Sequence, residues 1–333
     1  MNKVIKLILF SFGLLFLFGL IYRVGFYGII EIITKAKLSF LFLGVLVYLI
    51  LIFTRSLKWF LLVRIIGDGT KYRQFLPLYL VNSLMGNITP FKSGETITPF
   101  LFKKYLKIPV GQGFSIVILD RLFELIIFII ILVLAVFYTL NRGIQNSLIL
   151  SIFQGILVAL FLLLAILIIL VASKRITLKI IKLFNFFRRY SLGKKILEFA
   201  EKELDAFYGI LPLFKDKGIY KFMIPLTLLG WFFEILASYL VFSSVLPILF
   251  IDIATAQIIV MAATFVTFIP GGVGIAEIGV VYILGLFGYS LALAASGVLL
   301  VRLFLTSTLL ISGLIGFLLV RERRDGLFKK GTG

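Results

Sequence analysis

The stretch LILSIFQGILVALFLLLAILIILV, residues 148–171, contains no charged residue and is apolar except for Ser151 and Gln154. About 20 consecutive apolar residues suffice to cross the hydrocarbon core of a bilayer as a helix. A membrane β-strand would instead alternate between apolar and polar residues, and this stretch does not alternate. Residues 148–171 are therefore predicted to form a transmembrane helix, and this prediction decides how the rest of the chain is interpreted.

Similar runs recur along the chain. Hydrophobic residues make up 61% of the sequence, far above the roughly 45–50% of an average soluble domain. The run near the N-terminus lacks a small-residue cleavage site, so we interpret it as an uncleaved span rather than a signal peptide. Six full spans are expected, at about 4–22, 38–62, 112–140, 148–172, 222–247 and 290–320. The sequence thus predicts an all-α, polytopic integral membrane protein: one transmembrane domain over residues 1–333, without a soluble catalytic domain.

Two further apolar stretches, residues 75–106 and 252–288, are broken near their middles by PFKSGE at 90–95 and PGGVGIAE at 270–277. Their arms are too short for straight spans of about 20 residues. We therefore expect two membrane-embedded hairpins of broken helices, which brings the total to eight or more hydrophobic helices. Glycine suits such breaks because it adopts conformations closed to other residues. The expected hinge residues are Pro90, Gly94, Pro270, Gly271, Gly272 and Gly274.

The distribution of Lys and Arg predicts the orientation. Residues 174–221 carry twelve Lys and Arg against five Asp and Glu, and the C-terminal tail is also basic. Basic loops face the cytoplasm, so we expect both termini inside a plasma membrane. Basic residues also flank the 75–106 stretch, whereas residues 222–301 contain none. The first hairpin is therefore expected to open toward the cytoplasm and the second toward the outside.

The basic cytoplasmic segment, residues 173–221, contains an amphipathic pattern at residues 192–211. Apolar residues recur there at helical spacing, with charged residues on the opposite face. Such a helix lies on the inner leaflet or against the spans, or it is a packed cytoplasmic helix with no role in lipid binding, and the pattern is compatible with both interpretations.

The two breaks resemble each other in register. Pro90 and Gly94 recur 180 residues later as Pro270 and Gly274, and Arg-Leu-Phe at 121–123 recurs at 302–304. Together with the opposite facing of the hairpins, this predicts an inverted repeat with halves at about 38–140 and 222–320. In transporters with such repeats, broken helices at corresponding positions mark the substrate path. A buried cavity is expected, because freed backbone groups need protein or water as partners.

Charged residues inside a membrane are costly and are by default functional candidates. Arg121 and Arg302 suit bidentate binding of a phosphate. The glutamates near the breaks either line the cavity or only favour helix N-termini. Glu234 carries an ion or proton, or pairs with an arginine. The expected substrate-binding residues are Asn87, Glu95, Asp120, Arg121, Glu124, Glu234, Glu277 and Arg302.

Neighbouring charges refine this expectation. Asp120 and Glu124 share a helix face, and Arg121 and Glu124 are close enough to touch. Glu95, Arg121, Glu277 and Arg302 are expected to form a ring of paired charges around a midplane cavity. Arg55, Lys58 and Trp59 read instead as an interfacial anchor at the cytoplasmic end of the 38–62 span.

Several kinds of chemistry are not favoured. Cysteine and histidine are absent, which excludes thiolate and imidazole nucleophiles and metal ligands. No Walker A sequence is present, so ATP hydrolysis by that route is excluded. We therefore expect no cofactor, no metal and a transporter in place of an enzyme. The net charge of +19 is read as basic loops facing anionic lipid rather than nucleic acid.

Four motifs carry a family resemblance: RSLKW at 55–59, N-x-x-P-x-x-x-G-E at 87–95, DRLFE at 120–124, and PGGVGIAE at 270–277 followed by Arg302. They resemble the membrane (flippase-like) domain of lysylphosphatidylglycerol synthases. The sequence ends at Gly333, so we expect a stand-alone member that lacks the soluble transferase domain. The resemblance implies that Glu95, Arg121, Glu277 and Arg302 line the cavity.

The resemblance implies a lipid translocase that moves an anionic phospholipid or a polyprenyl-phosphate-linked lipid between leaflets. A membrane-embedded transferase, or an accessory subunit in lipid or cell-surface glycan biosynthesis, is the alternative. The expected partners are membrane lipids, with a homo-oligomer or a lipid-modifying enzyme also open. The lipid, the direction and the energy source are not visible in the sequence.

Overall fold

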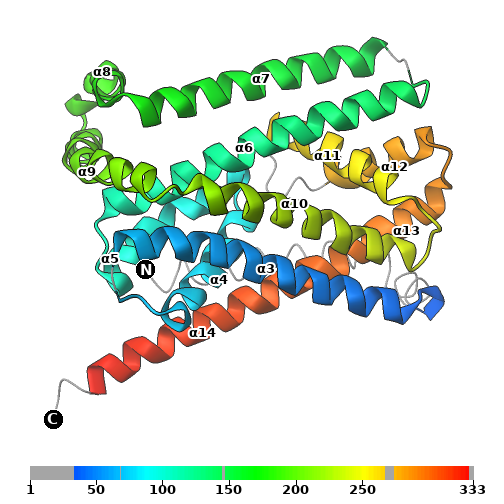
Figure 1. The fold of residues 1–333 in the computed structure, drawn as a ribbon, viewed down its shortest axis with the longest axis horizontal. Coiled ribbons are helices and arrows are strands. Elements are labelled where there is room, and N and C mark those ends of the chain that lie inside the picture. The colour runs from blue at the N-terminus through cyan, green and yellow to red at the C-terminus, as the bar shows by residue number, and fades with distance from the viewer. Residues whose placement is uncertain (1–33, 68, 145–146, 267–273, 330–333) are drawn as a thin grey trace.

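The computed structural model describes residues 34–67, 69–144, 147–266 and 274–329. Within these ranges every regular element is a helix (Figure 1). The predicted all-α class is confirmed, and the chain is a multi-pass membrane protein. The expected first span at 4–22 and the hinge residues Pro270, Gly271 and Gly272 lie outside the described residues.

The other five predicted spans are confirmed. Helices long and apolar enough to cross a membrane cover Leu38–Ile66, Val110–Asn141, Phe153–Ala172, Tyr220–Ser243 and Leu291–Arg321. In chain order the elements are α3 (Leu38–Ile66), α4 (Tyr72–Ile88), η1 (Pro90–Ile97), α5 (Thr98–Leu106), α6 (Val110–Asn141), α7 (Ser147–Ala172), α8 (Lys174–Leu183), η2 (Phe184–Arg189), α9 (Ser191–Asp216), α10 (Tyr220–Ser243), α11 (Phe250–Val266), α12 (Ile275–Leu286), α13 (Leu291–Val301), η4 (Arg302–Thr306) and α14 (Ser307–Lys329).

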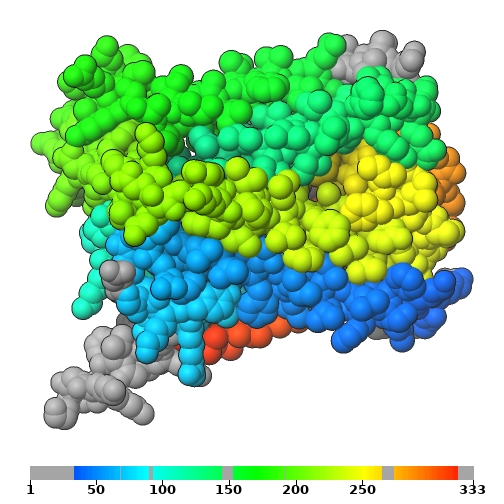
Figure 2. All heavy atoms as spheres, viewed as in Figure 1, coloured from blue at the N-terminus to red at the C-terminus, as the bar shows by residue number. Residues whose placement is uncertain are grey.

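The long helices run along the long axis of the molecule (Figure 1). One end, here called the basic end, contains α5, α8, the start of α9 and the end of α14. The opposite end, here called the far end, contains the start of α3 and the α12–α13 turn. Figure 2 shows α3 and α10 side by side across the middle of one face, with α6 and α7 beyond α10.

The first broken hairpin is made by α4, η1 and α5, and it lies toward the basic end (Figure 1). Pro90 begins the 3₁₀ turn η1. A Cβ added to Gly94 would lie 2.2 Å from the Met85 carbonyl oxygen of α4, so the hairpin closes only without a side chain there. Thr89 joins the arms, because its hydroxyl accepts a 2.6 Å hydrogen bond from the Gly94 amide and donates one of 2.8 Å to the Met85 carbonyl.

The second hairpin, α11 and α12, lies toward the far end (Figure 1). Gly274 is the N-cap of α12 and has a φ of 87°. A residue with a Cβ rarely adopts that conformation, which explains the glycine. The two hairpins therefore lie toward opposite ends of the molecule, whereas the side of the membrane that each one faces stays a prediction.

Helix packing repeats between the two parts of the chain. In the first part α4 packs along α14, and in the second α11 packs along α6. The α3 and α10 helices, which begin the two predicted halves, pack against each other. The inverted repeat stays a prediction; in its terms, the last helix of each predicted half packs along the hairpin of the other half.

The last span differs from the expectation of one regular helix. Between α13 and α14 the chain forms a π-helical turn, η4, that starts at Arg302. A π turn widens the helix locally and is frequent at functional sites. It occurs here at the arginine that the repeat singled out.

For the amphipathic helix α9, packing against the spans is the confirmed alternative. Leu197, Leu204, Phe207 and Phe214 on its apolar face are buried, and α9 packs along α6. The preceding helix α8 contains no buried residue. The basic segment therefore contains two kinds of helix: α9 packs against the spans, whereas no residue of α8 is buried.

Candidate functional site

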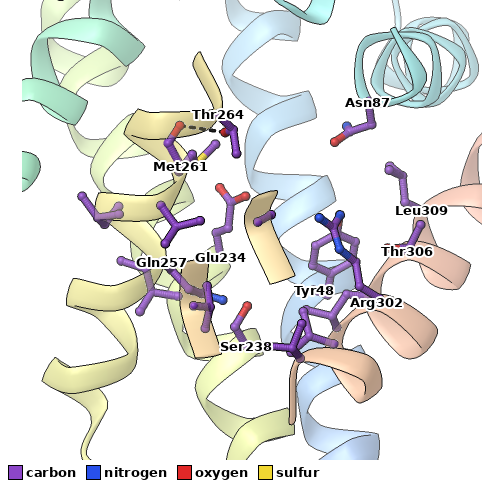
Figure 3. A pocket seen from close by; sticks show the side chains of 18 of the residues that line it. Tyr48, Asn87, Glu234, Ser238, Gln257, Met261, Thr264, Arg302, Thr306 and Leu309 are labelled. Atoms are coloured by element: carbon purple, nitrogen blue, oxygen red, sulfur yellow. Dashed lines mark hydrogen bonds between the residues drawn. The ribbon is translucent and has the colours of Figure 1, made fainter. Parts of the chain in front are cut away.

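A cavity of about 500 Å³ lies inside the helix bundle, beside the second hairpin (Figure 3). Residues of α3, α4, α10, α11, α12, α13, η4 and α14 line it, and most of them are apolar. Its polar lining comprises Tyr48, Asn87, Glu234, Ser238, Gln257, Thr264, Arg302 and Thr306. A mostly apolar cavity of this size with a few polar groups is typical of a small-molecule or headgroup site.

Arg302 forms an ion pair with Glu277, which lies at the second break. Its Nε atom lies 2.8 Å from Oε1 of Glu277, and each side chain is 20% exposed. The other carboxylate oxygen of Glu277 accepts a 2.6 Å hydrogen bond from the Gly274 amide. Glu277 therefore caps the N-terminus of α12 and also orients Arg302, so the helix-terminus role that the sequence left open is confirmed for this glutamate.

Glu234 lies on α10 and lines the same cavity (Figure 3). Its carboxylate forms a 2.6 Å ion pair with Arg55 of α3. The arginine in turn lies against the Trp231 ring, 5.9 Å from its centroid. The expectation that Glu234 pairs with an arginine is confirmed.

A second, much smaller cavity of about 30 Å³ lies beside the first hairpin. Arg121 of α6 forms a 2.5 Å ion pair with Glu95 of η1, and lies 3.6 Å from Asp120. The side chain of Glu95 is 9% exposed and lies against Gly86 of α4. The remaining space is about that of one water molecule.

Lys58 joins the charges of this smaller cavity. Its Nζ lies 2.8 Å from Asp120 and 2.5 Å from Glu124, and the side chain is 1% exposed. It also donates a 3.3 Å hydrogen bond to the Thr227 hydroxyl of α10. We name the linked set Lys58, Glu95, Asp120, Arg121 and Glu124 the charge network.

The interfacial-anchor interpretation of Arg55, Lys58 and Trp59 is wrong. The helix α3 continues to Ile66, so these residues lie before its end and inside the bundle, where Trp59 is also buried. The sequence did hold a signal: Asp120 and Glu124 place two carboxylates in one span with only Arg121 as a neighbouring cation. A buried carboxylate needs a compensating charge, so a further buried cation was required.

The predicted ring of four charges forms two separate ion pairs instead. Glu95 pairs with Arg121 and Glu277 pairs with Arg302, each pair at its own break. Asn87 lines both cavities, and its side-chain amide also donates a 2.9 Å hydrogen bond to the Ser83 carbonyl. Asn87 therefore lies between the two cavities and contributes to the lining of both.

A charged cluster at the far end was not found by sequence reasoning. Asp252 is fully buried and forms a 3.0 Å ion pair with Arg142. Its carboxylate also accepts hydrogen bonds of 2.7 Å from the hydroxyls of Tyr138 and Tyr289. Partial burial and the hydrogen bond to Asp252 raise the pKa of Tyr289. The cluster fastens α6 to α11 and to the α12–α13 turn.

The described residues contain no group of Asp and Glu that could hold a metal ion. Every carboxylate at the two cavities pairs with a Lys or Arg instead. The arrangement offers paired charges around a mostly apolar space, which suits binding of a charged headgroup.

The sequence profile of one protein family, described as lysylphosphatidylglycerol synthase TM region, matches residues 3–313. A UPF0104 membrane protein of Methanocaldococcus jannaschii is 26% identical, with 97% of both chains covered. One of Methanothermobacter thermautotrophicus is 26% identical over 89% of this chain and 90% of its own. Another of Pyrococcus horikoshii is 24% identical over 96% of this chain and 97% of its own. No solved structure matches the chain.

Proposed function

Because the chain belongs to the lysylphosphatidylglycerol synthase transmembrane-region family, we propose that it is a lipid translocase. Its substrate is an anionic phospholipid or a polyprenyl-phosphate-linked lipid, which it moves between the leaflets of a plasma membrane. The observation that carries the proposal is the cavity of about 500 Å³ that Arg302 lines beside a broken helix.

The headgroup enters this cavity and its phosphate binds Arg302. Charge-assisted hydrogen bonds from a guanidinium to a phosphate are roughly twice as strong as neutral ones. Glu277 orients the guanidinium through Nε, and Asn87, Gln257 and Thr306 supply neutral polar groups around it. The lipid tails stay in the bilayer, since they gain nothing by leaving it.

Two oppositely facing hairpins support movement between leaflets. In inverted-repeat transporters the two halves rock around a site at the repeat interface. Here α3 and α10 form one of the contacts between the predicted halves, and both contribute to the cavity lining. The proposal places the basic end in the cytoplasm, where Lys and Arg concentrate anionic lipids.

The test is leaflet exchange of labelled phosphatidylglycerol and labelled polyprenyl phosphate in liposomes that contain the purified protein. The key variant is Glu277→Gln/Arg302→Gln, which removes one ion pair at the cavity while glutamine still caps α12. The matched control is Arg142→Gln/Asp252→Asn, which removes one ion pair at the far end. We expect exchange by the wild type and the control, and its loss in the cavity variant.

Other outcomes would overturn the proposal. If the wild type chemically changes the lipid, the protein is a membrane-embedded transferase. If it neither moves nor changes any tested lipid but copurifies with a lipid-modifying enzyme, it is an accessory subunit. Equal exchange by both double variants would remove Arg302 from the mechanism.

A further inference from the structure

The segment 174–190, which contains α8 and η2, combines exposed apolar side chains with a strongly basic composition. No residue of α8 or η2 is buried. Leu183 is 75% exposed and Phe186 63% exposed. Such exposure is ordinary for the lipid-facing side chains of a membrane span. In α8, however, the exposed apolar side chains occur together with several Lys and Arg residues.

The charge of this segment is of one sign. Residues 174–190 contain six Lys and Arg and no Asp or Glu. Two of them are held by α9, because Lys174 pairs with Asp205 and Arg188 pairs with Glu201 at 2.6 Å. The other four are exposed and have no ion-pair partner among the described residues: Arg175, Lys179, Lys182 and Arg189.

The orientation of α8 is fixed by the corner that precedes it. The Ser173 hydroxyl caps α8 by accepting a hydrogen bond of 3.3 Å from the Ile176 amide. The Tyr208 hydroxyl of α9 forms hydrogen bonds to both helices that meet at this corner. It donates to the Leu170 carbonyl of α7 and also bonds the Thr177 hydroxyl of α8. Figure 1 shows α8 end-on where α7 runs across the view, so α8 lies across the direction of the spans.

A helix across the end of a span, with an aliphatic side, aromatic neighbours and a cationic side, matches an interfacial helix. Its apolar side chains insert between lipid chains while Lys and Arg remain at the level of the headgroups. The aromatic residues Phe184, Phe186, Phe187 and Tyr190 are all exposed and follow directly after α8.

We propose that α8 and η2 form a second lipid-binding surface, separate from the central cavity, which lies in the headgroup region of an anionic leaflet. Charge complementarity identifies the occupant: four unpaired cations and no acid favour phosphate-bearing lipids over a basic or neutral partner. By contrast α9, which carries acids as well as bases, has its apolar side covered by α6.

The experiment uses the full chain in vesicles and exploits the absence of cysteine, so that a single introduced cysteine takes the only spin label. Phe186→Cys places the label on the surface, and Lys217→Cys places it in the exposed turn after α9 as a matched control. The measurement is the accessibility of each label to oxygen and to a water-soluble nickel complex.

We expect the label at position 186 to be accessible to oxygen and protected from nickel, and the label at position 217 to show the reverse. The protection should increase when phosphatidylglycerol replaces part of the phosphatidylcholine. Replacement of Arg175, Lys179, Lys182 and Arg189 by glutamine should abolish that increase. The Lys174 and Arg188 ion pairs remain in this variant, so α8 keeps its attachment to α9.

Three results would overturn the proposal. Equal nickel accessibility at positions 186 and 217 would place the surface in water. Protection that is the same with and without anionic lipid would make the contact purely apolar. Spin–spin broadening at position 186 would show that a second copy of the chain covers it. None of these results depends on lipid exchange, so the proposed translocation stands or fails separately.

Discussion

The two breaks share a motif but have different surroundings. At the first, Glu95 and Arg121 belong to a charge network that fills its space, leaving about 30 Å³. At the second, Glu277 and Arg302 form a pair beside a cavity of about 500 Å³. Residues at corresponding places in the two parts of the chain therefore have different roles. Glu95 and Arg121 hold the helices of the first break together, whereas Glu277 and Arg302 lie beside an open cavity.

The difference is informative about a transporter with inverted repeats. If the halves exchange conformations during transport, one break is closed while the other is open. The structure would then describe one end state, with the first break closed. The same asymmetry predicts that substitutions at the first break affect stability, and substitutions at the second affect lipid movement.

The largest expected effect is that of Lys58→Met at the first break. The substitution removes the Lys58 ammonium from the carboxylates of Asp120 and Glu124, and breaking a buried ion pair costs roughly 3–5 kcal/mol. Thermal unfolding in detergent should show a much lower midpoint or no folded protein. The triple variant Lys58→Met/Asp120→Asn/Glu124→Gln should recover most of the loss. Failure to recover would show that Lys58 acts through packing instead of charge.

Arg121→Gln and Arg302→Gln make the same change at the two breaks. Loss of Arg121 leaves Glu95 in a closed site and should cost about 2–3 kcal/mol, whereas loss of Arg302 leaves Glu277 beside the cavity and should cost about 1 kcal/mol. In liposomes Arg302→Gln should lower exchange about tenfold, the equivalent of one charge-assisted hydrogen bond. Equal losses of stability would contradict the asymmetry between the breaks.

Gly94→Ala and Gly274→Ala compare the two glycines. A methyl group at Gly94 meets the Met85 carbonyl, so α4 and η1 must separate, at a cost of about 2–3 kcal/mol. At Gly274 the space is open and only the φ of 87° is unfavourable, which costs about 1–2 kcal/mol. Unfolding midpoints of the two variants check the order. A greater loss at Gly274 would show that the second break is the more tightly constrained.

The smallest effect on stability is expected for Met261→Trp, which fills part of the larger cavity. Because the cavity has room, the free energy of unfolding should change by only about 0.5 kcal/mol. Lipid exchange should nevertheless fall strongly, since the headgroup loses its space. Leu163→Trp on the exposed side of α7 is the control and should preserve exchange. Undiminished exchange by Met261→Trp would mean that lipid takes another path.

The sequence by itself determined the membrane-spanning helices, the two broken hairpins and their opposite facing. These follow from local properties: the length of apolar runs, the conformational limits of Pro and Gly, and the placement of Lys and Arg. The register of the repeat also singled out Glu95, Arg121, Glu277 and Arg302, although it predicted one ring of charges where the structure has two separate ion pairs.

Only the tertiary structure decided which charges meet across the bundle. Lys58 lies 62 residues before Asp120, and Arg55 lies 179 residues before Glu234. Neither spacing carries a signal, since pairing depends on how α3 is rotated against α6 and α10. Size of the cavities, burial of Asp252 and the lack of cover over α8 have the same origin. Burial is a property of packed neighbours, and a linear pattern specifies which face of a helix is apolar without specifying what covers it.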